Sequence, residues 1–532
     1  MAFFLPLDIP LFYRKESYNN NCMNKIKRFL KTSFSRILVL LIAVIFQIII
    51  QYSFVHWLYD KLTWIEAFLR LLAVIITLGI VKNSRHLSMD IVWVILINIF
   101  PLVGAVLYIL LGADLFISKT YRDIKTMTEE SARYYTQDPE VMKKAGEVTP
   151  DKIGQFRYIS SYAGYPVYKN TGFEYYDLGE KGFPVMLEEL KKAEKFIFLE
   201  YFIIEEGVMW DSILAILEEK AKQGVEVRVM YDDFGSFFLL PGSYYRTLEE
   251  KGIKCVPFNR ISILLNVILN HRDHRKIMVI DGKVAFSGGI NLADEYINHV
   301  KRFGKWKDNI IKITGEAVWS YTVMFLTHWN ALRKEDHTFL SFRNEAIKGE
   351  EDGFIAPYGE TPLDDEICAQ NIYTNIINES NDYCYICTPY LIIDTEMINS
   401  LILAARRGVD IRIITPGIPD KKMVFAITRS YYEQLIKGGV KIFQYDPGFV
   451  HAKVMASDDQ IATVGTVNLD YRSLYLHFEN GAFLYGSKKI DAIRDDLISM
   501  MEEGHEVTLA ECDNGPIKEF LLSILRLFAP LM

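Results

Sequence analysis

Three long apolar runs lie near the start of the chain, at residues 37–55, 66–81 and 91–112. The first and third are long enough to cross a bilayer as helices, because about 20 apolar residues span its hydrocarbon core. The middle run is shorter and carries Glu66 and Arg70, so it either spans the bilayer or lies in its interface. The hydrophobic pattern therefore predicts a membrane region.

The segment before these runs is basic, which predicts a cytoplasmic N-terminus under the positive-inside rule. Three full spans would then place the rest of the chain outside the cell, whereas two spans keep it inside. The first run is too long for a signal peptide and no small-residue cleavage site follows it. Met23 precedes a basic stretch and is the more natural start, so residues 1–22 are predicted to be an optional extension.

Beyond the apolar runs, the pattern changes to strands that alternate with helices, and it does so twice. The first half is predicted to contain a strand, a helix and a strand, and the second half repeats this order. The predicted ranges are 195–204, 211–223 and 225–231 in the first half, and 383–393, 396–407 and 409–415 in the second. Such alternation indicates βαβ units. We therefore predict an α/β fold: a duplicated domain with two mixed or mostly parallel sheets flanked by helices.

The domain boundaries follow from the same pattern. The charged stretch 343–365 contains Gly and Pro and is the predicted linker between the halves. The predicted parts are a basic segment (1–36), a membrane region (37–112), a polar, helix-leaning connector (113–172), a first half (173–342), the linker (343–365) and a second half (366–532).

Composition narrows the functional classes. The chain has 532 residues, half of them hydrophobic, and a net charge of −8. No large Lys/Arg block is present in the sequence, so we expect no nucleic-acid partner. Beyond Cys22 five cysteines are scattered along the chain, which suits a reducing compartment rather than a disulfide framework. Cys384 and Cys387 have zinc-site spacing, but they lie in an apolar, strand-like run without a second pair, so a packed strand is predicted.

One motif occurs twice. The stretch NHRDHRKIMVIDG contains His274, Lys276 and Asp281, and the stretch VHAKVMASDD contains the matching residues. A Gly-Gly or Gly-Thr turn and an asparagine follow each copy, 17 positions after the histidine both times. The second set is His451, Lys453 and Asp458, and the two asparagines are Asn291 and Asn468.

The spacing of the motif points to anion chemistry. Residues two apart in a strand share a face, so each histidine lies beside its lysine. A lysine supplies charge and donors to an anion, and a histidine can attack or carry a proton. A single copy is equally compatible with a half-exposed strand face, but two matched copies favour a site. The sequence offers no further ligands that recur beside the histidines, so we expect no metal and no cofactor.

These residues resemble the phospholipase D superfamily, and NHRDHRKIMVIDG, GGINLADEY and GTVNLDYRS are most similar to bacterial cardiolipin synthases. The resemblance covers nearly the whole chain. It implies a pseudo-twofold pair of halves in which both motifs face one cleft. It also implies orienting carboxylates, Asp308 and Glu479, against the imidazoles, and lysines and asparagines that hold the phosphate oxygens. We expect Asp281 and Asp458, although they belong to the catalytic motifs, to be scaffold acids that fix the turn and the lysine.

The resemblance further implies a reaction. One phosphatidylglycerol would give its phosphatidyl group to a histidine and release glycerol, and a second phosphatidylglycerol would then take that group to form cardiolipin. The alternatives are a hydrolytic phospholipase D, another phosphatidyltransferase of the superfamily, or a catalytically dead membrane scaffold. The expected partners are membrane phospholipids and the bilayer. The expected location is a bacterial plasma membrane, multi-pass, with the catalytic part on the cytoplasmic face. The oligomeric state is left open.

The roles of the two histidines are predicted from their surroundings. Arg272, Asp273 and Arg275 place charge around His274, which suits a substrate phosphate, and the superfamily tends to use the first motif's histidine as nucleophile. His451 would then be the acid and base, with Glu479 steadying its charged form.

Regions outside the motifs carry further predictions. His271 is expected to be a loop residue, and the apolar stretches 237–241 and 261–269 are candidates for lipid contact, with a buried element the alternative for the second. Residues 517–531 have apolar positions at helical spacing and are predicted to pack against the catalytic body.

Overall fold

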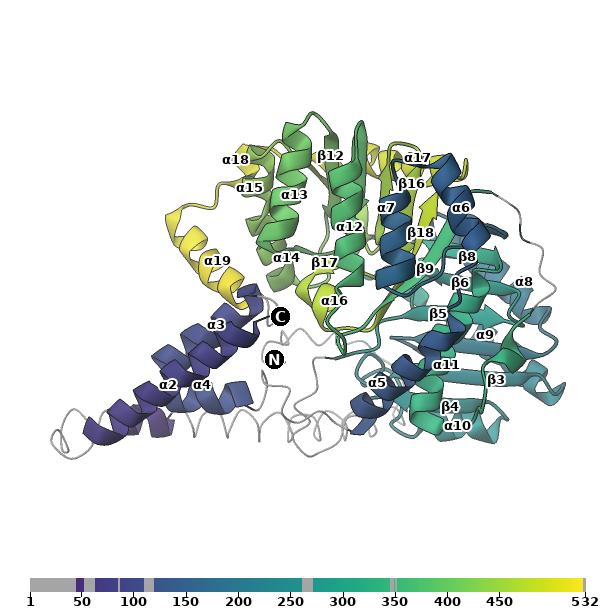
Figure 1. Cartoon of the computed structure of the whole chain (residues 1–532), viewed down its shortest axis with the longest axis horizontal. Coiled ribbons are helices and arrows are strands. Elements are labelled where there is room, and N and C mark those ends of the chain that lie inside the picture. Colours follow the sequence, from purple (N-terminus) through teal and green to yellow (C-terminus); the bar gives the residue numbers. More distant parts are fainter. Residues whose placement is uncertain are drawn as a thin grey trace. The chain divides into compact units, whose positions relative to one another are not determined.

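The computed structural model describes residues 45–51, 63–84, 87–109, 119–260, 271–344, 349 and 352–529 (Figure 1). The chain divides into two compact units. The smaller comprises Met1–Ser118, Ile261–Asn270 and Arg526–Met532, and the larger comprises Lys119–Arg260 and His271–Leu525. The basic segment 1–36 and the predicted start at Met23 lie outside the described residues.

The smaller unit contains the apolar helices. Helix α2 (Thr63–Asn83) includes residues Trp64–Asn83, the one helix among the described residues that is long and apolar enough to cross a membrane, with a mean hydropathy of 2.1. Two of its three charged residues, Glu66 and Arg70, neutralise each other, because Arg70 Nη2 lies 2.6 Å from Glu66 Oε1 one helical turn away, and the third, Lys82, lies in the last turn. The middle run, which the sequence predicted to be the weakest span, therefore forms the one candidate spanning helix among the described residues.

The third apolar run is not one spanning helix. It divides into α3 (Leu87–Ile99) and α4 (Pro101–Leu107), of 13 and 7 residues. Phe100 leaves the helical conformation at φ −127° and ψ 76°, and Pro101 starts the next helix. A Cβ on Gly104 would lie 2.5 Å from the Leu96 carbonyl oxygen, so the two helices pack closely. The prediction of a single helix over 91–112 is wrong, because proline ends the first helix. Of the first run, residues 45–51 are helical, and the rest lies outside the described residues.

The larger unit contains two large sheets (Figure 1). The first has the order β1-β8-β6-β5-β2-β3-β4 and the second the order β19-β13-β12-β10-β15-β16-β18-β9. The first sheet's strands are β1 (Thr171–Tyr176), β2 (Phe196–Tyr201), β3 (Glu226–Asp232), β4 (Lys254–Phe258), β5 (Lys276–Ile280), β6 (Val284–Gly288) and β8 (Ile310–Gly315). The second sheet's are β9 (Phe354–Glu360), β10 (Tyr383–Cys387), β12 (Asp410–Pro416), β13 (Lys441–Tyr445), β15 (Val454–Ser457), β16 (Ile461–Gly465), β18 (Glu479–Tyr485) and β19 (His505–Glu506).

The two strand orders match element by element, which confirms the duplication. Strands β4-β3-β2-β5-β6-β8-β1 correspond to β13-β12-β10-β15-β16-β18-β9, and β19 is an addition at one edge. Each sheet is mixed rather than mostly parallel: β2, β3 and β4 pair in parallel, while β5, β6, β8 and β1 pair antiparallel. The reason is the tight turn at Asp281–Gly282, which joins β5 to β6 as a hairpin.

Helices cover both sheets. Helix α11 (Val318–Arg333) packs across four strands of the first sheet and against β9, and nearly all of its residues are buried. Helix α17 (Ile490–Glu502) packs across six strands of the second sheet. The predicted helices 211–223 and 396–407 are α9 (Val208–Lys222) and α13 (Thr395–Arg406), which lie beside their parallel strands (Figure 1). The remaining helices of the halves are α8 (Gly179–Lys191), α10 (Tyr244–Glu250), α12 (Cys368–Glu379), α14 (Lys422–Ser430) and α15 (Tyr432–Lys437).

The connector is helical, as predicted, in α5 (Lys119–Ser131), α6 (Pro139–Val148) and α7 (Ile153–Arg157). It is also well packed, because Phe156 is fully buried against aromatic side chains of the second sheet. The predicted linker 343–365 is wrong in part, since it contains β9, the counterpart of β1. The sequence pattern does not predict strand β9, because its sequence, FIAPYGE, contains Pro and Gly. An edge strand tolerates both residues.

Two smaller predictions are decided by burial. Cys384 and Cys387 are buried free thiols in β10, which confirms a packed strand there. The C-terminal helix α19 (Pro516–Phe528) is wrongly predicted to pack against the catalytic body, because Leu522 is its one buried residue and its apolar face is exposed.

Candidate active site

Backbone hydrogen bonds join each motif to the other half of the larger unit. The amide of His274, just before β5, donates to the Phe478 carbonyl over 2.9 Å. The amide of His451, just before β15, donates to the Lys307 carbonyl over 2.7 Å. Short strand pairs accompany these bonds: Asp273 bridges to Phe478, and β14 (Gly448–Val450) pairs with β7 (Lys305–Lys307). One site is thus built from both halves, as the resemblance implies.

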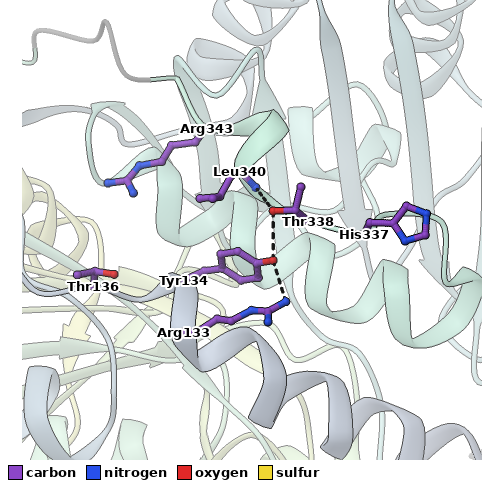
Figure 2. A pocket seen from close by; sticks show the side chains of 7 residues that line it. All are labelled: Arg133, Tyr134, Thr136, His337, Thr338, Leu340 and Arg343. Carbon is purple, nitrogen blue, oxygen red and sulfur yellow. Dashed lines mark hydrogen bonds between the residues drawn. The ribbon is translucent and has the colours of Figure 1, made fainter.

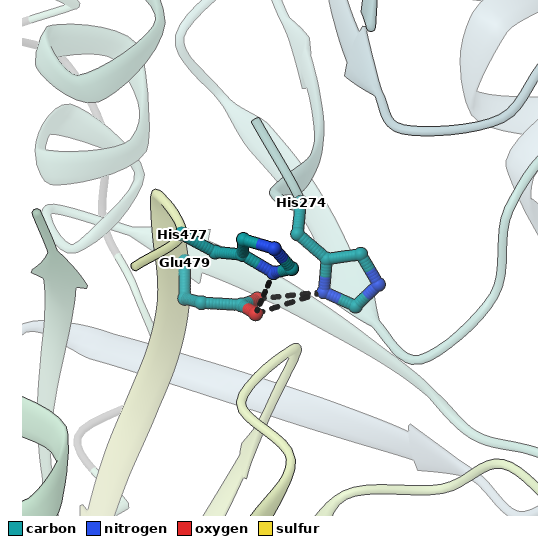
Figure 3. Close-up of side chains that lie close together, drawn as sticks. All are labelled: His274, His477 and Glu479. Carbon is teal, nitrogen blue, oxygen red and sulfur yellow. Dashed lines mark hydrogen bonds and ion pairs between the residues drawn. The ribbon is translucent and has the colours of Figure 1, made fainter. Parts of the chain in front are cut away.

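The acids also cross between halves. Both carboxylate oxygens of Glu479, the first residue of β18, lie 2.9 Å from His274 Nδ1, and Figure 3 shows this contact. Asp308, just before β8, places Oδ2 2.7 Å from His451 Nδ1. A carboxylate on Nδ1 fixes the imidazole tautomer and leaves Nε2 for chemistry. The prediction that Glu479 steadies His451 is wrong, because each acid reaches across to the other half's motif.

The two motif lysines are buried beside the histidines. Lys276 Nζ donates to the His274 carbonyl over 2.7 Å, and Lys453 Nζ donates to the His451 carbonyl. Burial, together with the Lys453 ammonium, lowers the pKa of Lys276 to about 7, and burial lowers that of Lys453 to about 8. Two desolvated cations in one site favour the binding of an anion.

Both histidines are neutral at neutral pH. Burial lowers the pKa of His451 to about 4, with Lys453 contributing. Burial, both lysines and the charge of His451 hold the pKa of His274 well below its ordinary value. A neutral imidazole with a free Nε2 has the electron pair that a nucleophile or base requires.

The motif aspartates lie at the far ends of the strands. Asp281 accepts hydrogen bonds from the amides of Glu194, Lys195 and Phe196, at 2.9, 2.7 and 2.9 Å. Asp458 accepts from the amides of Asn381, Asp382 and Tyr383, at 2.8, 3.0 and 2.9 Å. Both have a positive φ of 53°. They hold the turn to the start of β2 or β10, which is the geometry that a scaffold role for the turn requires, and their hydrogen bonds among the described residues do not reach the motif lysines.

The two asparagines differ in their contacts. Asn291 accepts from the Ile203 amide over 3.0 Å and donates to the Tyr296 hydroxyl over 2.7 Å. Asn468 is buried, and its Oδ1 has no hydrogen-bond partner among the described residues. A phosphate-holding role for this pair stays a prediction.

The charges next to His274 do not face the site. Arg275 pairs with Glu200 at 3.0 Å and with Asp273 at 3.3 Å, and Arg272 lies 3.6 Å from a second buried acid, Asp232. Side chains alternate along an extended chain, so residues 273 and 275 point away from the face that carries 274 and 276. The prediction that they hold a substrate phosphate is wrong.

Several neighbours of the catalytic rings were missed from the sequence. The Thr466 hydroxyl donates to Glu479, and Gly289 occupies the matching place in the first half. A Cβ at Gly289 would lie 1.9 Å from Asp308 Oδ1, so only glycine leaves room for that carboxylate. The aligned turns G-G-x-N and G-T-x-N contain this signal in their second position, which is Gly289 in the first half and Thr466 in the second. In both halves this second residue faces the orienting acid.

Aromatic rings line the two histidines. Phe202 and His477 lie beside His274, at ring-centroid distances of 5.0 and 5.8 Å. Tyr296 and Trp306 lie beside His451, at 5.4 and 5.5 Å. His477 and Trp306 each precede an orienting acid by two residues, and this matched spacing was the one sequence signal for them.

Two side-chain clusters have a spacing that suits a metal ion. In the first, ligand atoms of His274, His477 and Glu479 lie within 4.8 Å of one another (Figure 3). The charges of Lys276 and Lys453 lower the pKa of His274, so the local field opposes a cation. The second cluster, Glu200, Asp273 and His328, already contains the Arg275 guanidinium. Neither donor set fits a metal.

A cavity of about 370 Å³ lies away from the motifs (Figure 2). Its lining includes Arg133, Tyr134 and Thr338, whose hydrogen bonds to one another Figure 2 shows. It contains no motif residue, and its side chains come from the connector and the segment after α11. Volume therefore does not identify the catalytic site, which is defined by the crossed His–acid pairs.

The remaining sequence candidates lie outside the site. His271 is a loop residue, as predicted, and its ring packs against Tyr121 at 5.3 Å. In the apolar stretch 237–241, Phe238 is exposed while Leu240 is buried, so lipid contact there stays a prediction. The stretch 261–269 lies outside the described residues.

Two mixed sheets with paired His–Lys motifs at one site define a phospholipase D-like enzyme. Residues 186–324 and 373–501 match the family described as "Cardiolipin synthase, PLD-like domain". The chain belongs to this family.

Relatives share this sequence over most of its length, and a solved structure shares the fold. A cardiolipin synthase of Halalkalibacterium halodurans is 32% identical over 468 residues, which cover 86% of this chain and 92% of the relative. An uncharacterized protein of Streptococcus mutans is 44% identical over 457 residues, which cover 85% and 98%. The crystal structure of phosphatidylserine synthase from Haemophilus influenzae Rd KW20 is similar in fold, with a TM-score of 0.54 at 14% identity, over 68% of this chain and 95% of that one.

Proposed function

We propose that this chain is a cardiolipin synthase that transfers a phosphatidyl group from one phosphatidylglycerol to another at the bilayer, giving cardiolipin and glycerol. The observation that carries the proposal is the crossed arrangement of two neutral histidines, each oriented by a buried carboxylate, beside two buried lysines. The family match and the cardiolipin synthases among the relatives support the choice of substrate.

The reaction has two displacements at phosphorus. In the first, His451 takes up a proton on Nε2 when the anionic substrate binds, and Asp308 stabilises the imidazolium. His274 Nε2 forms a bond to phosphorus while the bond from phosphorus to the glycerol oxygen breaks, and His451 gives that oxygen its Nε2 proton. In the second, His451 takes the proton from a hydroxyl of the second phosphatidylglycerol. That oxygen attacks phosphorus, and the phosphorus–nitrogen bond breaks. The sum is two phosphatidylglycerols converted into cardiolipin and glycerol, with no cofactor.

The lysines stabilise the charge that this transfer creates. Lys276 and Lys453 donate to backbone carbonyls in the structure, and a phosphate oxygen is a stronger acceptor that would replace those carbonyls. Asn291 and Asn468 would contribute further donors to the non-bridging oxygens.

The choice of His274 as nucleophile has a new basis in place of the neighbouring charges. The charge of His451 is among the causes that lower the pKa of His274, so a proton in the site resides on His451. The group that holds the proton can act as the general acid, and the group that stays neutral can act as the nucleophile.

The rival enzyme activity is hydrolysis, with water in place of the second lipid. Labelled phosphatidylglycerol in liposomes separates the two, because transfer yields cardiolipin and free glycerol, whereas hydrolysis yields phosphatidic acid. We expect cardiolipin as the main product, unchanged activity in EDTA, and suppression of cardiolipin by added glycerol, which reverses the first step. Phosphatidic acid as the main product would replace the proposal with a phospholipase D.

The catalytically dead scaffold is tested with histidine variants. His274→Ala and His451→Ala should each reduce turnover to below about one per cent of wild type, because both displacements need both rings. His271→Ala is the matched control outside the site and should retain turnover. Equal product from all three variants and the wild type would mean that this site does not perform the reaction.

A further inference from the structure

The C-terminal helix α19 has an apolar stripe that no described residue covers. Ile517, Phe520, Leu521 and Ile524 follow one another at helical spacing on one face, with exposed fractions of 79%, 67%, 54% and 41%. Leu522, on a different face, is buried. An apolar stripe of this size is costly to leave in water, so it marks a contact surface.

The end of the helix indicates what this contact is. Phe528, four residues after Ile524 and therefore on the same face, belongs to the smaller unit. There it packs against the buried cluster formed by the apolar helices, namely Ala73, Ile80, Val92, Trp93 and Ile97. The last residues of α19 thus belong to the same compact unit as the membrane-crossing candidate α2.

The apolar surface of α2 is equally exposed. Trp64, Phe68, Leu71, Ile75 and Leu78 are each more than half exposed, as expected for side chains that face lipid. The polar residues of α19, among them Lys518, Glu519 and Ser523, lie off the stripe. A helix with one apolar face and charges beside it suits the plane of the membrane interface.

We propose that α19 lies in the membrane interface, with Ile517, Phe520, Leu521 and Ile524 inserted among the lipids. The helix is then a second attachment of the chain to the bilayer, at the opposite end of the sequence from the apolar runs. It links the last element of the catalytic unit to the lipid surface from which a lipid substrate must come.

The test uses the full-length chain with all six cysteines replaced. Single cysteines at Leu521, on the stripe, and at Ser523, off it, are labelled with an environment-sensitive fluorophore. The protein is reconstituted in phosphatidylcholine–phosphatidylglycerol vesicles with brominated acyl chains. We expect bromine to quench the label at 521 several-fold more than the label at 523. Equal quenching at the two positions would overturn the proposal, as would disulfide cross-linking of two copies through 521.

A functional test is independent of the label. The double variant Phe520→Glu and Leu521→Glu should lower turnover of vesicle phosphatidylglycerol by about tenfold or more. Turnover of a short-chain, water-soluble phosphatidylglycerol should stay within twofold, because the catalytic residues are untouched. Ser523→Glu adds charge off the stripe and is the matched control. Equal loss on both substrates would mean that the stripe acts by packing rather than by lipid contact.

The walls of the catalytic site carry a second, independent feature. His477 and Trp306 hold equivalent positions in the two halves, two residues before Glu479 and Asp308. Both are buried, and the Trp306 Nε1 and both ring nitrogens of His477 have no hydrogen-bond partner among the described residues. Figure 3 shows the His477 ring beside that of His274, with Nδ1 3.7 Å from Glu479 Oε1.

Buried N–H groups are nearly always paired, so two unpaired groups at matched positions beside the two catalytic rings point to a ligand. Glu479 binds His274 and Thr466 at hydrogen-bond distance, whereas its contact with His477 Nδ1 is longer, at 3.7 Å, and His477 Nε2 has no hydrogen-bond partner among the described residues. We infer that His477 and Trp306 donate to oxygens of the reacting phosphodiester, one from each half. This inference rests on the proposed function, since it assigns the ligand of that site.

Inorganic phosphate gives a test that is separate from turnover. Phosphate should protect His274 from diethyl pyrocarbonate, as measured on the isolated peptide. Trp306→Phe and His477→Phe keep an aromatic ring and remove the donor, and each should raise the half-protecting phosphate concentration about tenfold. Tyr162→Phe, at an exposed position outside the motifs, is the control. Unchanged protection in both variants would overturn the inference, whereas protection that shifts in an enzyme that forms no cardiolipin would overturn the proposed function alone.

Discussion

At the scale of single residues, the site is a set of neutral rings and partly desolvated cations. Burial lowers the pKa of each catalytic histidine and of each motif lysine. For a base, a lowered pKa means that the proton is lost at a lower pH than usual. The histidines thus gain the neutral form that attack requires, while the lysines come close to losing the charge that holds phosphate.

These shifts predict the pH profile of kcat/KM. Activity should fall at acid pH, where the nucleophile His274, whose pKa burial holds well below its ordinary value, becomes charged, and above about pH 7, where Lys276 loses its proton. Lys276→Arg keeps the charge at all these values, so the alkaline limb should move toward about pH 8, the pKa of Lys453. The measurement is the initial rate of cardiolipin formation at low substrate across the pH range. An alkaline limb that does not move in Lys276→Arg would assign that limb to another group.

The crossed acids give a prediction that separates the two halves. Glu479→Gln should change the rate at which diethyl pyrocarbonate modifies the His274 peptide and leave the His451 peptide unchanged, and Asp308→Asn should do the reverse. Turnover should fall by about 10–100-fold in each, less than when a histidine is removed. The effects are read by mass spectrometry of the digested protein. Modification that changes within the same half would contradict the crossed pairing.

The residues of the site were predicted unevenly. Both His–Lys pairs and both orienting acids were identified from their repeated spacing, and the structure brings them together. The sequence did not predict which acid pairs with which histidine, because it does not reveal which half's acid reaches which ring. The charges at 272, 273 and 275 do not hold a phosphate because all three side chains form buried ion pairs, and those of 273 and 275 also alternate away from the face that carries His274.

At the scale of elements, the motif is a hairpin tied at its far end. Asp281 and Asp458 accept three backbone amides each and so fix the turn against the preceding strand. Substitution of either aspartate is therefore expected to affect activity by destabilising the fold rather than by changing the chemistry.

Asp458→Asn tests this. Asparagine tolerates the positive φ at this position but loses the charge and one acceptor oxygen. The free energy of unfolding should fall by about 1–3 kcal/mol, with turnover per folded molecule within a few-fold of wild type. Asp459→Asn, an exposed neighbour that also has a positive φ, is the control and should cost less than about 1 kcal/mol. Thermal denaturation and active-site titration supply the two quantities. Full stability with lost turnover would instead make Asp458 part of the chemistry.

Helices and strands with a clean period were predicted well, and those with proline were not. The βαβ pieces of both halves were found at the expected positions. Strand β9 was read as a linker because Pro and Gly interrupt its alternation, and the third apolar run was read as one helix across Pro101. In both cases the local sequence pattern does not determine the secondary structure, and packing against neighbouring elements does.

At the scale of the whole molecule, the membrane region and the catalytic unit together set which side of the bilayer is used. We predict a cytoplasmic catalytic unit, because its five cysteines are free and buried. Single cysteines introduced at exposed Asp382 or Glu396 of a cysteine-free variant should resist a membrane-impermeant thiol reagent in intact cells and react after permeabilisation. Labelling of intact cells would put the unit outside.

The crossing of the two acids has a consequence for how such a site arises. Neither half holds a complete catalytic pair, since each histidine depends on a carboxylate supplied by the other. A single-copy ancestor with this geometry would be active only as a homodimer in which two identical chains exchange acids. Fusion of two copies preserves that exchange within one chain and frees the halves to diverge, as Gly289 with Asp308 and Thr466 with Glu479 have done. The same dependence makes the chain a natural split enzyme, whose separated halves regain turnover only when they meet.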